Sequence, residues 1–191
     1  AGHPAEDAHR TGRREDGHYP LMRIVSFLPT ATEMLYALGL GKSLVGRSEH
    51  CVWPPEVKRK PVVVSSHVKK LAKQDSLAIH KAVVKLREQG VHQFDIHAAV
   101  LRRLKPDLVV TQNLCSVCAA SHPEVTEAIQ HLTKKPRVLT LQAQRFDPLF
   151  AELKQLGNLT GRQKQAEQLV RKLEKRLDRV RQRVARHCSG H

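Results

Sequence analysis

Two apolar runs in this chain each end in a loop whose side chains suit a metal or a flat ligand. The runs begin at Val45 and Leu108, and their loops extend to Pro55 and Cys118. Together the loops hold His50, Cys51, Trp53, Cys115 and Cys118. In an open parallel sheet, ligands bind in the crevice outside the carboxyl ends of the strands. If both runs are parallel strands, the pattern predicts one ligand site formed by both loops.

Short β-branched runs alternate with amphipathic stretches along residues 22–157. The expected strands are residues 23–28, 43–47, 61–65, 108–112 and 137–141. The expected helices are residues 30–38, 75–89, 97–104, 123–132 and 147–156. This alternation is typical of α/β proteins with a mainly parallel, Rossmann-like sheet. The sequence therefore predicts one α/β lobe over residues 22–157.

The first helix of the lobe is expected to start at Thr30. Pro29 has no backbone N–H for a strand ladder, so it is expected to end the first strand. Thr30 and Glu33 have the capping-box spacing, in which each side chain bonds to the other residue's backbone N–H. Thr30 is therefore expected to be the N-cap, and Gly39 is expected to end the helix.

One long α-helix is expected to follow the lobe, over residues 158–186. No evident breaker occurs between Thr160 and Arg186, and at ~1.5 Å per residue this stretch would be roughly 40 Å long. Its apolar positions alternate at spacings of four and three and are Ala166, Val170, Leu173, Leu177, Val180 and Val184. Such a stripe either packs along its own lobe or pairs two copies of the chain as a homodimer. Residues 187–191 are expected to be a tail.

The first 21 residues differ from the rest of the chain. They contain charges and histidines but no apolar periodicity, which indicates a disordered leader over residues 1–21. They also lack the apolar core of a secretory signal. The chain as given is therefore expected to be cytoplasmic.

The chain is strongly basic, with 33 Lys and Arg against 18 Asp and Glu, a formal net charge of +15. A surplus of this size favours anionic partners, including nucleic acids. The basic residues are spread along the chain, however, and aromatic residues, which stack on bases, make up only 4% of it. We therefore expect no nucleic-acid partner, and a basic nucleic-acid-interacting protein is the third of our candidate functions.

The Cys115-x-x-Cys118 spacing leaves three interpretations open. The two thiols could form a redox pair, because a helix N-terminus lowers the pKa of a thiol. With Cys51 and His50 they would form a Cys3His set, which suits zinc if the four side chains converge. They could also be two small residues that pack at the start of a helix. A cysteine-based metal-binding or redox protein is therefore our second candidate function.

Trp53 precedes two prolines that stiffen its loop, so its ring could stack on a flat ligand or cover the edge of the sheet. The sequence contains no G-x-G-x-x-G motif, P-loop, nucleophile elbow or paired-carboxylate motif. The absence of these motifs favours a binding protein over an enzyme.

Several segments, in order, resemble one known family. They are residues 23–33, Leu38-Gly39-Leu40, residues 45–48 and 54–57, and Leu104-Lys105-Pro106-Asp107-Leu108-Val109. The series resembles the helical-backbone (class III) substrate-binding proteins of ABC transporters, which bind cobalamin or iron chelates. Its closest branch looks like the cobalamin-binding-protein-like one, whose members carry similar cysteines. The resemblance covers about residues 23–185.

The resemblance implies two lobes of the periplasmic-binding-protein type joined by a long helix, with the ligand between them. Residues 22–157 would be the N-terminal lobe and residues 158–186 the connecting helix, with the second lobe absent. It implies a corrinoid or another metal chelate as the ligand, and the ligand-binding positions would be Pro29, Thr30, Cys51, Trp53 and Gln112. It also implies a periplasmic location if a signal has been removed.

The family docks on an ABC permease through acidic residues. By the resemblance, Ala99 stands where relatives carry the acid on the helix before Lys105-Pro106-Asp107. Docking of this chain on a permease is therefore in doubt.

Overall fold

The lobe is built on a six-stranded sheet with the strand order β4-β3-β2-β1-β5-β6. The computed structural model describes residues 22–67, 75–89, 91, 94–112 and 122–188. The strands are β1 (Ile24–Ser26), β2 (Leu44–Ser48), β3 (Val62–Ser66), β4 (Phe94–Ile96), β5 (Leu108–Gln112) and β6 (Arg137–Leu141). Every pairing among these strands is parallel except that of β3 with β4. The α/β lobe with a mainly parallel sheet is thus confirmed.

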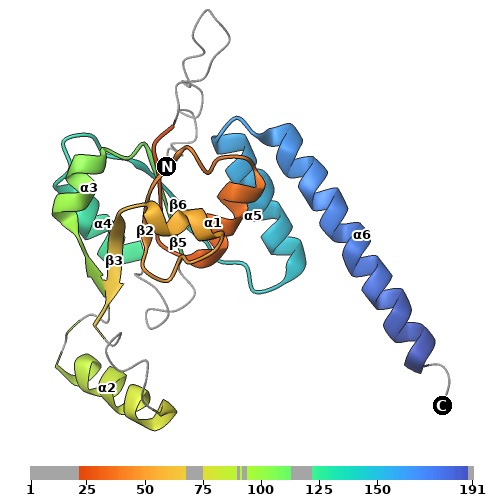
Figure 1. The fold of residues 1–191 in the computed structure, drawn as a ribbon, viewed down its shortest axis with the longest axis horizontal. Helices are drawn as coiled ribbons and strands as arrows, with labels where there is room; N and C mark the ends of the chain where they lie inside the picture. The colour runs from red at the N-terminus through yellow and green to blue at the C-terminus, as the bar shows by residue number, and fades with distance from the viewer. Residues whose placement is uncertain (1–21, 68–74, 90, 92–93, 113–121, 189–191) are drawn as a thin grey trace, which may run out of the picture.

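The helices cover both faces of this sheet (Figure 1). They are α1 (Pro29–Ala37), α2 (Ser76–Glu88), α3 (Ala98–Leu104), α4 (His122–Gln130), α5 (Phe146–Leu159) and α6 (Gln163–Cys188), with a 3-10 helix η1 (Pro55–Arg59) after β2. Side chains of α1, α5 and α6 pack on one face, and those of α3 and α4 on the other. Figure 1 shows α2 apart from the other helices, near the end of β3.

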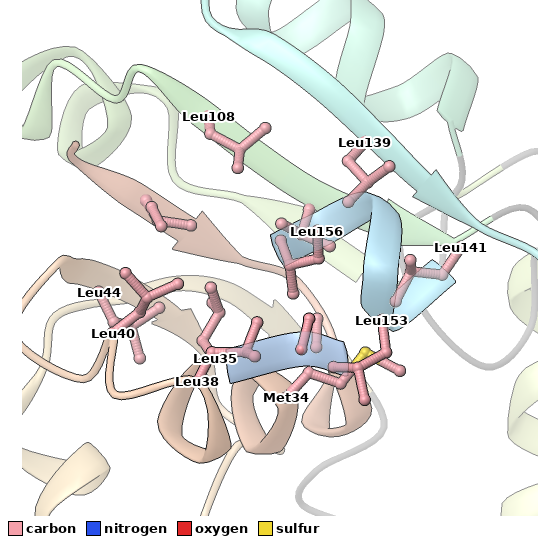
Figure 2. Close-up of a cluster of buried hydrophobic side chains, with 14 of the residues drawn as sticks. Met34, Leu35, Leu38, Leu40, Leu44, Leu108, Leu139, Leu141, Leu153 and Leu156 are labelled. Carbon is pink, nitrogen blue, oxygen red and sulfur yellow. The ribbon is translucent and has the colours of Figure 1, made fainter. Parts of the chain in front are cut away.

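Alternate residues of the central strands enter two separate cores. Ile24 and Leu108 face the core under α1 and α5, whereas Val25 and Val109 face the core under α3 and α4. Figure 2 shows the first core, in which leucines of β5 and β6 meet those of α1 and α5. Because both faces are covered, these strands form continuous apolar runs in the sequence, and this is why the sequence revealed them.

The start of α1 differs from the expected capping box. Leu28 is the N-cap, without a side-chain cap bond, and Pro29 is in the first turn, where its missing N–H costs nothing. The expected N-cap role of Thr30 is therefore wrong. The hydroxyl that secures this turn belongs to Thr32, which donates to Ser26 Oγ at 2.9 Å. Ser26 Oγ in turn donates to the carbonyl of Leu28 at 2.9 Å.

The single element expected over residues 158–186 is divided by a turn. Helix α5 continues to Leu159, and α6 begins at Gln163. Gly161 has φ +69°, a left-handed conformation that glycine adopts without strain. Arg162 donates its N–H to the carbonyl of Gly157 at 2.7 Å, which closes the turn. The long helix is confirmed, but it starts later than expected.

Helix α6 packs on the lobe only along its first part. Ala166 and Val170 are buried, whereas Val180 and Val184 are 53% and 56% exposed. With 26 residues the helix is about 39 Å long, and Figure 1 shows its C-terminal part extending away from the sheet. None of the helices in the described part of the chain is long and apolar enough to cross a membrane.

The Lys105-Pro106-Asp107 turn joins three strands. Asp107 Oδ2 accepts the N–H of Arg23 at 2.8 Å, just before β1, and Oδ1 accepts Lys134 Nζ at 2.5 Å. The carbonyl of Asp107 accepts the N–H of Arg137 at 3.0 Å, where β6 begins. This turn lies at the amino ends of the strands, so its role is to fix their alignment rather than to hold a ligand.

Gly157 allows α5 and α6 to approach closely, because an added Cβ would lie 2.5 Å from the Cβ of Ala166. We expect Gly157→Ala to lower the free energy of unfolding by about 1–3 kcal/mol through overpacking. This loss should exceed the roughly 1 kcal/mol gained in helix propensity. Urea unfolding followed by circular dichroism measures it. Because Ala166→Gly removes the clash, the two losses should not add in the double variant, and simple additivity would contradict the contact.

Asp107→Asn should destabilise the lobe by about 1 kcal/mol near neutral pH. Burial alone would raise the pKa of Asp107, but the hydrogen bonds from Lys134 and Arg23 and their charges hold that pKa below its ordinary value. A lowered pKa in the folded state stabilises the fold above the unfolded value of about 3.9, and this contribution disappears as the pH falls through the lowered pKa. Urea unfolding at pH 7 and below pH 4 should show the difference shrinking. Asp178→Asn, in an exposed ion pair with Arg181, is the control and should change stability by less than about 0.5 kcal/mol at both pH values.

Candidate functional site

The carboxyl ends of the parallel strands form the candidate site. In the sheet, β1 is flanked by β2 and β5. From β1 the chain adds β2, β3 and β4 on one side, and then β5 and β6 on the other. Ligands of open α/β sheets bind in the crevice at such a topological switch. A hollow of about 160 Å³ lies here, which we call the edge hollow. Its lining residues are Phe27, Leu28, Pro29, Thr30, Ser48, His50, Phe94 and Gln112.

His50 presents an imidazole at the edge hollow, with its side chain 51% exposed. Its ring meets the ring of Phe94 edge to face, with centroids 6.1 Å apart and an interplanar angle of 87°. Its Nε2 lies 3.9 Å from Oε1 of Glu49, and the buried Glu49 carboxylate also accepts the N–H of Ser66. The ring is therefore held between an aromatic edge and a fixed carboxylate.

Arg47 shapes the loop that carries His50 and Trp53. Its buried guanidinium donates from Nη1 to the carbonyls of Ser48, Glu49 and Cys51, at 3.0, 3.2 and 3.3 Å. Nη2 donates to the carbonyl of Lys58 at 3.3 Å. One side chain thus fixes the backbone on both sides of His50 and ties it to η1.

A second hollow, which we call the helix groove, lies beside the first and has a volume of about 500 Å³. Its lining is mostly apolar and comprises Thr30, Glu33, Met34, Tyr36, Ala37, Trp53, Pro54, Leu149, Phe150, Leu153, Leu169 and Leu173. Trp53 is 62% exposed here, so its ring does not belong to the core. Thr30 lines both hollows, which places them next to each other.

The structure gathers most of the expected ligand positions at these hollows. Pro29, Thr30 and Gln112 line the edge hollow, and Trp53 lines the helix groove. Cys51 differs, because it is fully buried and lines neither hollow. Burial raises the pKa of its thiol, although hydrogen bonds with Thr32 and Ser48 act in the opposite direction. Its expected contact with a ligand is therefore not supported by its position.

The expected zinc site is not assembled in the described part of the chain. Within those residues, no three His, Cys, Asp or Glu side chains lie together as a metal-binding group would require. Cys115 and Cys118 lie outside the described residues. A site formed by these two cysteines with Cys51 and His50 stays a prediction.

Sequence reasoning missed several residues of this region, among them Arg47, Phe94 and Ser48. Arg47 was the hardest of these residues to predict from the sequence. Arginine is usually exposed, and the burial of this one depends on carbonyls that only the folded loop provides. Phe94 belongs to β4, which the sequence did not reveal. Ser48 could have been found, because it directly follows the second expected strand.

The chain matches one protein family over most of its own length. The family described as "periplasmic binding protein" matches residues 24–189. The chain belongs to this family. The resemblance found in the sequence is thereby confirmed, as is the lobe architecture with its long C-terminal helix.

Three relatives illustrate the similarity. "Uncharacterized ABC transporter substrate-binding lipoprotein YvrC" of Bacillus subtilis is 28% identical over 164 residues, which are 85% of this chain and 41% of the relative. A vitamin B12-binding protein of Pectobacterium atrosepticum is 25% identical over 170 residues, 88% of this chain and 48% of the relative. The crystal structure of a possible iron-binding periplasmic solute-binding protein of Staphylococcus epidermidis matches with a TM-score of 0.58 and 26% identity, covering 83% of this chain and 49% of that chain.

The chain spans about half the length of the relatives that it matches. The matched half contains the whole described lobe and α6.

Arg47→Met should lower the free energy of unfolding by about 2–3 kcal/mol, because it leaves four loop carbonyls without their charged donor. It should also loosen Trp53, which is seen as a drop in fluorescence anisotropy. Arg59→Met, an exposed arginine in η1, is the matched control. Equal stability and anisotropy in the two variants would contradict the role given to Arg47.

Proposed function

We propose that this chain is the N-terminal lobe and connecting helix of the substrate-binding component of an ABC-type uptake system. Its ligand is cobalamin or a related metal chelate such as an iron chelate. The observation that carries the proposal is the position of Trp53, exposed in an apolar groove beside the edge hollow with its few polar groups. The vitamin B12-binding relative and the iron-binding structure support this ligand class.

The two hollows suit a large, flat and partly polar ligand. Binding sites for small molecules combine apolar walls with a few polar groups that fix orientation. The helix groove offers the apolar wall, with Trp53 as its exposed aromatic, and the edge hollow offers Thr30, His50 and Gln112. A ligand larger than either hollow would extend across Thr30 into both. Its opposite face would then be free to contact the additional part of the protein that the longer relatives have.

The proposed transport role concerns an extracytoplasmic protein. The relatives include a lipoprotein and a periplasmic solute-binding protein, which favours this location over the cytoplasmic one expected from the chain as given.

Docking on a permease is expected to be weak. Ala99 is exposed in the first turn of α3, and that turn contains no acidic residue.

The other candidate functions have less support. A cysteine-based metal or redox site depends on Cys115 and Cys118, which lie outside the described residues. A homodimer through α6 stays a prediction that the exposed Val180 and Val184 favour. Nucleic-acid binding has only the net charge in its favour.

Trp53 fluorescence tests the proposed function, since it is the single tryptophan of the chain. Cyanocobalamin, haemin and ferrichrome are each titrated into the protein, with N-acetyltryptophanamide correcting for absorbance. At least one chelate should quench Trp53 in a saturable manner. By calorimetry, Trp53→Ala should bind that chelate about tenfold more weakly, because a stacking contact is lost.

Phe146→Ala is the control for this variant, since Phe146 is exposed but lines neither hollow. It should bind the chelate as the unchanged protein does. The proposed function is contradicted if no chelate quenches Trp53 in this chain or in a chain extended to the full length of the relatives.

A further inference from the structure

We propose that His50 is an axial ligand to the metal of the bound chelate. The site would then select chelates whose metal has an open or exchangeable axial position. This inference rests on the proposed function and adds to it a donor atom and a class of ligand. It is carried by the place of His50 at the edge hollow and by the way its neighbours orient the ring.

The imidazole is accessible and already positioned. Half of the side chain is exposed at the hollow, while the backbone on either side is held by the Arg47 guanidinium. Phe94 meets the ring edge to face, which favours the observed orientation of the imidazole. An imidazole that is already held in place loses little conformational entropy when it binds a metal.

Oε1 of the buried Glu49 carboxylate lies 3.9 Å from Nε2 of His50, which is beyond hydrogen-bond distance but close enough for its charge to attract the ring edge. A carboxylate beside a metal-binding imidazole is a common orienting arrangement. Glu49 thus adds a charged neighbour that favours one orientation of the ring.

The reach of the loop permits one chelate to meet both aromatic and donor groups. Trp53 and His50 are three residues apart, a span of at most about 10 Å of backbone. A tetrapyrrole ring is wide enough to lie against the indole while its central metal approaches the imidazole. Trp53 itself cannot coordinate, because an indole N–H is only a donor.

The chemistry is ligand exchange without electron transfer. The imidazole nitrogen donates its lone pair to the metal, and the water that occupied the axial position leaves with its own pair. Histidine is a common axial ligand of haem iron. A single axial donor completes a coordination sphere that the chelate largely supplies, so it does not require the cluster of protein ligands that zinc needs.

Absorption spectra with four chelates test the proposal. Aquocobalamin and haemin have an exchangeable axial position, whereas cyanocobalamin and ferrichrome do not. Aquocobalamin or haemin should bind with a shift of its visible bands, and His50→Ala should abolish the shift and weaken binding at least ~10-fold. Any binding of cyanocobalamin should stay within about twofold of that of the unchanged protein.

His50→Tyr provides a second spectroscopic test, since a phenolate that replaces the imidazole should give a different, tyrosinate-type haem spectrum instead of no shift. His131→Ala, an exposed histidine that follows α4, is the matched control and should behave as the unchanged protein does. Circular dichroism confirms that each variant is folded.

A band shift that persists in His50→Ala overturns the proposal, since another group would then hold the metal. So does saturable quenching of Trp53 by all four chelates with equal affinity in the unchanged protein and in His50→Ala. In that second case the proposed function stands while the axial role of His50 fails. The absence of quenching by any chelate contradicts the proposed function itself.

Discussion

The burial of both faces of the central strands is the constraint on which the rest of the structure depends. Ile24 and Leu108 must meet α1 and α5, and Val25 and Val109 must meet α3 and α4, so helices have to cross on both sides. Parallel strands with such crossovers end at one edge. The loops at that edge are the parts of the chain that the cores do not constrain, and there the lobe can present polar and aromatic groups.

At this edge the protein replaces apolar packing by a buried cation. Burying a charge is costly unless it is hydrogen-bonded. The Arg47 guanidinium offsets this cost by donating to four carbonyls of residues 48–58, although its buried Nε has no hydrogen-bond partner among the described residues. In exchange, residues 49–54 have a defined shape without belonging to a helix or strand. Two different side chains, His50 and Trp53, are thereby held at adjoining hollows. The geometry of the site therefore follows from one buried charge more than from the loop's own turn propensities.

The sequence predicted those features that local patterns encode. Continuous runs such as Val62-Val63-Val64 revealed the parallel strands, and the apolar stripe of α6 revealed the long helix. The strand β4 was missed because it has three residues and its pairing with β3 depends on a distant segment. The burial of Cys51 was not foreseen for a similar reason, since burial is a property of the assembled loop, and its contact with a ligand stays a prediction. Thr30 and Gln112 reached the hollows because they lie at or just beyond strand ends, whereas Trp53, five residues beyond β2, also depends on the loop that Arg47 holds.

Helix α6 shows how an element can be stable yet incompletely covered. Its first turns are fixed by the close contact of Ala166 with Gly157, and each later apolar residue left in water forgoes roughly 1.5–3 kcal/mol of burial. Residues 151–191 contain eleven Lys and Arg against four Asp and Glu, so two such helices repel each other except where salt screens them. Under the proposed function, the additional length of the relatives would cover this stripe, since Leu169 and Leu173 of α6 already line the helix groove. A partner placed there would also close over Trp53, so covering the helix and enclosing the ligand would be one event.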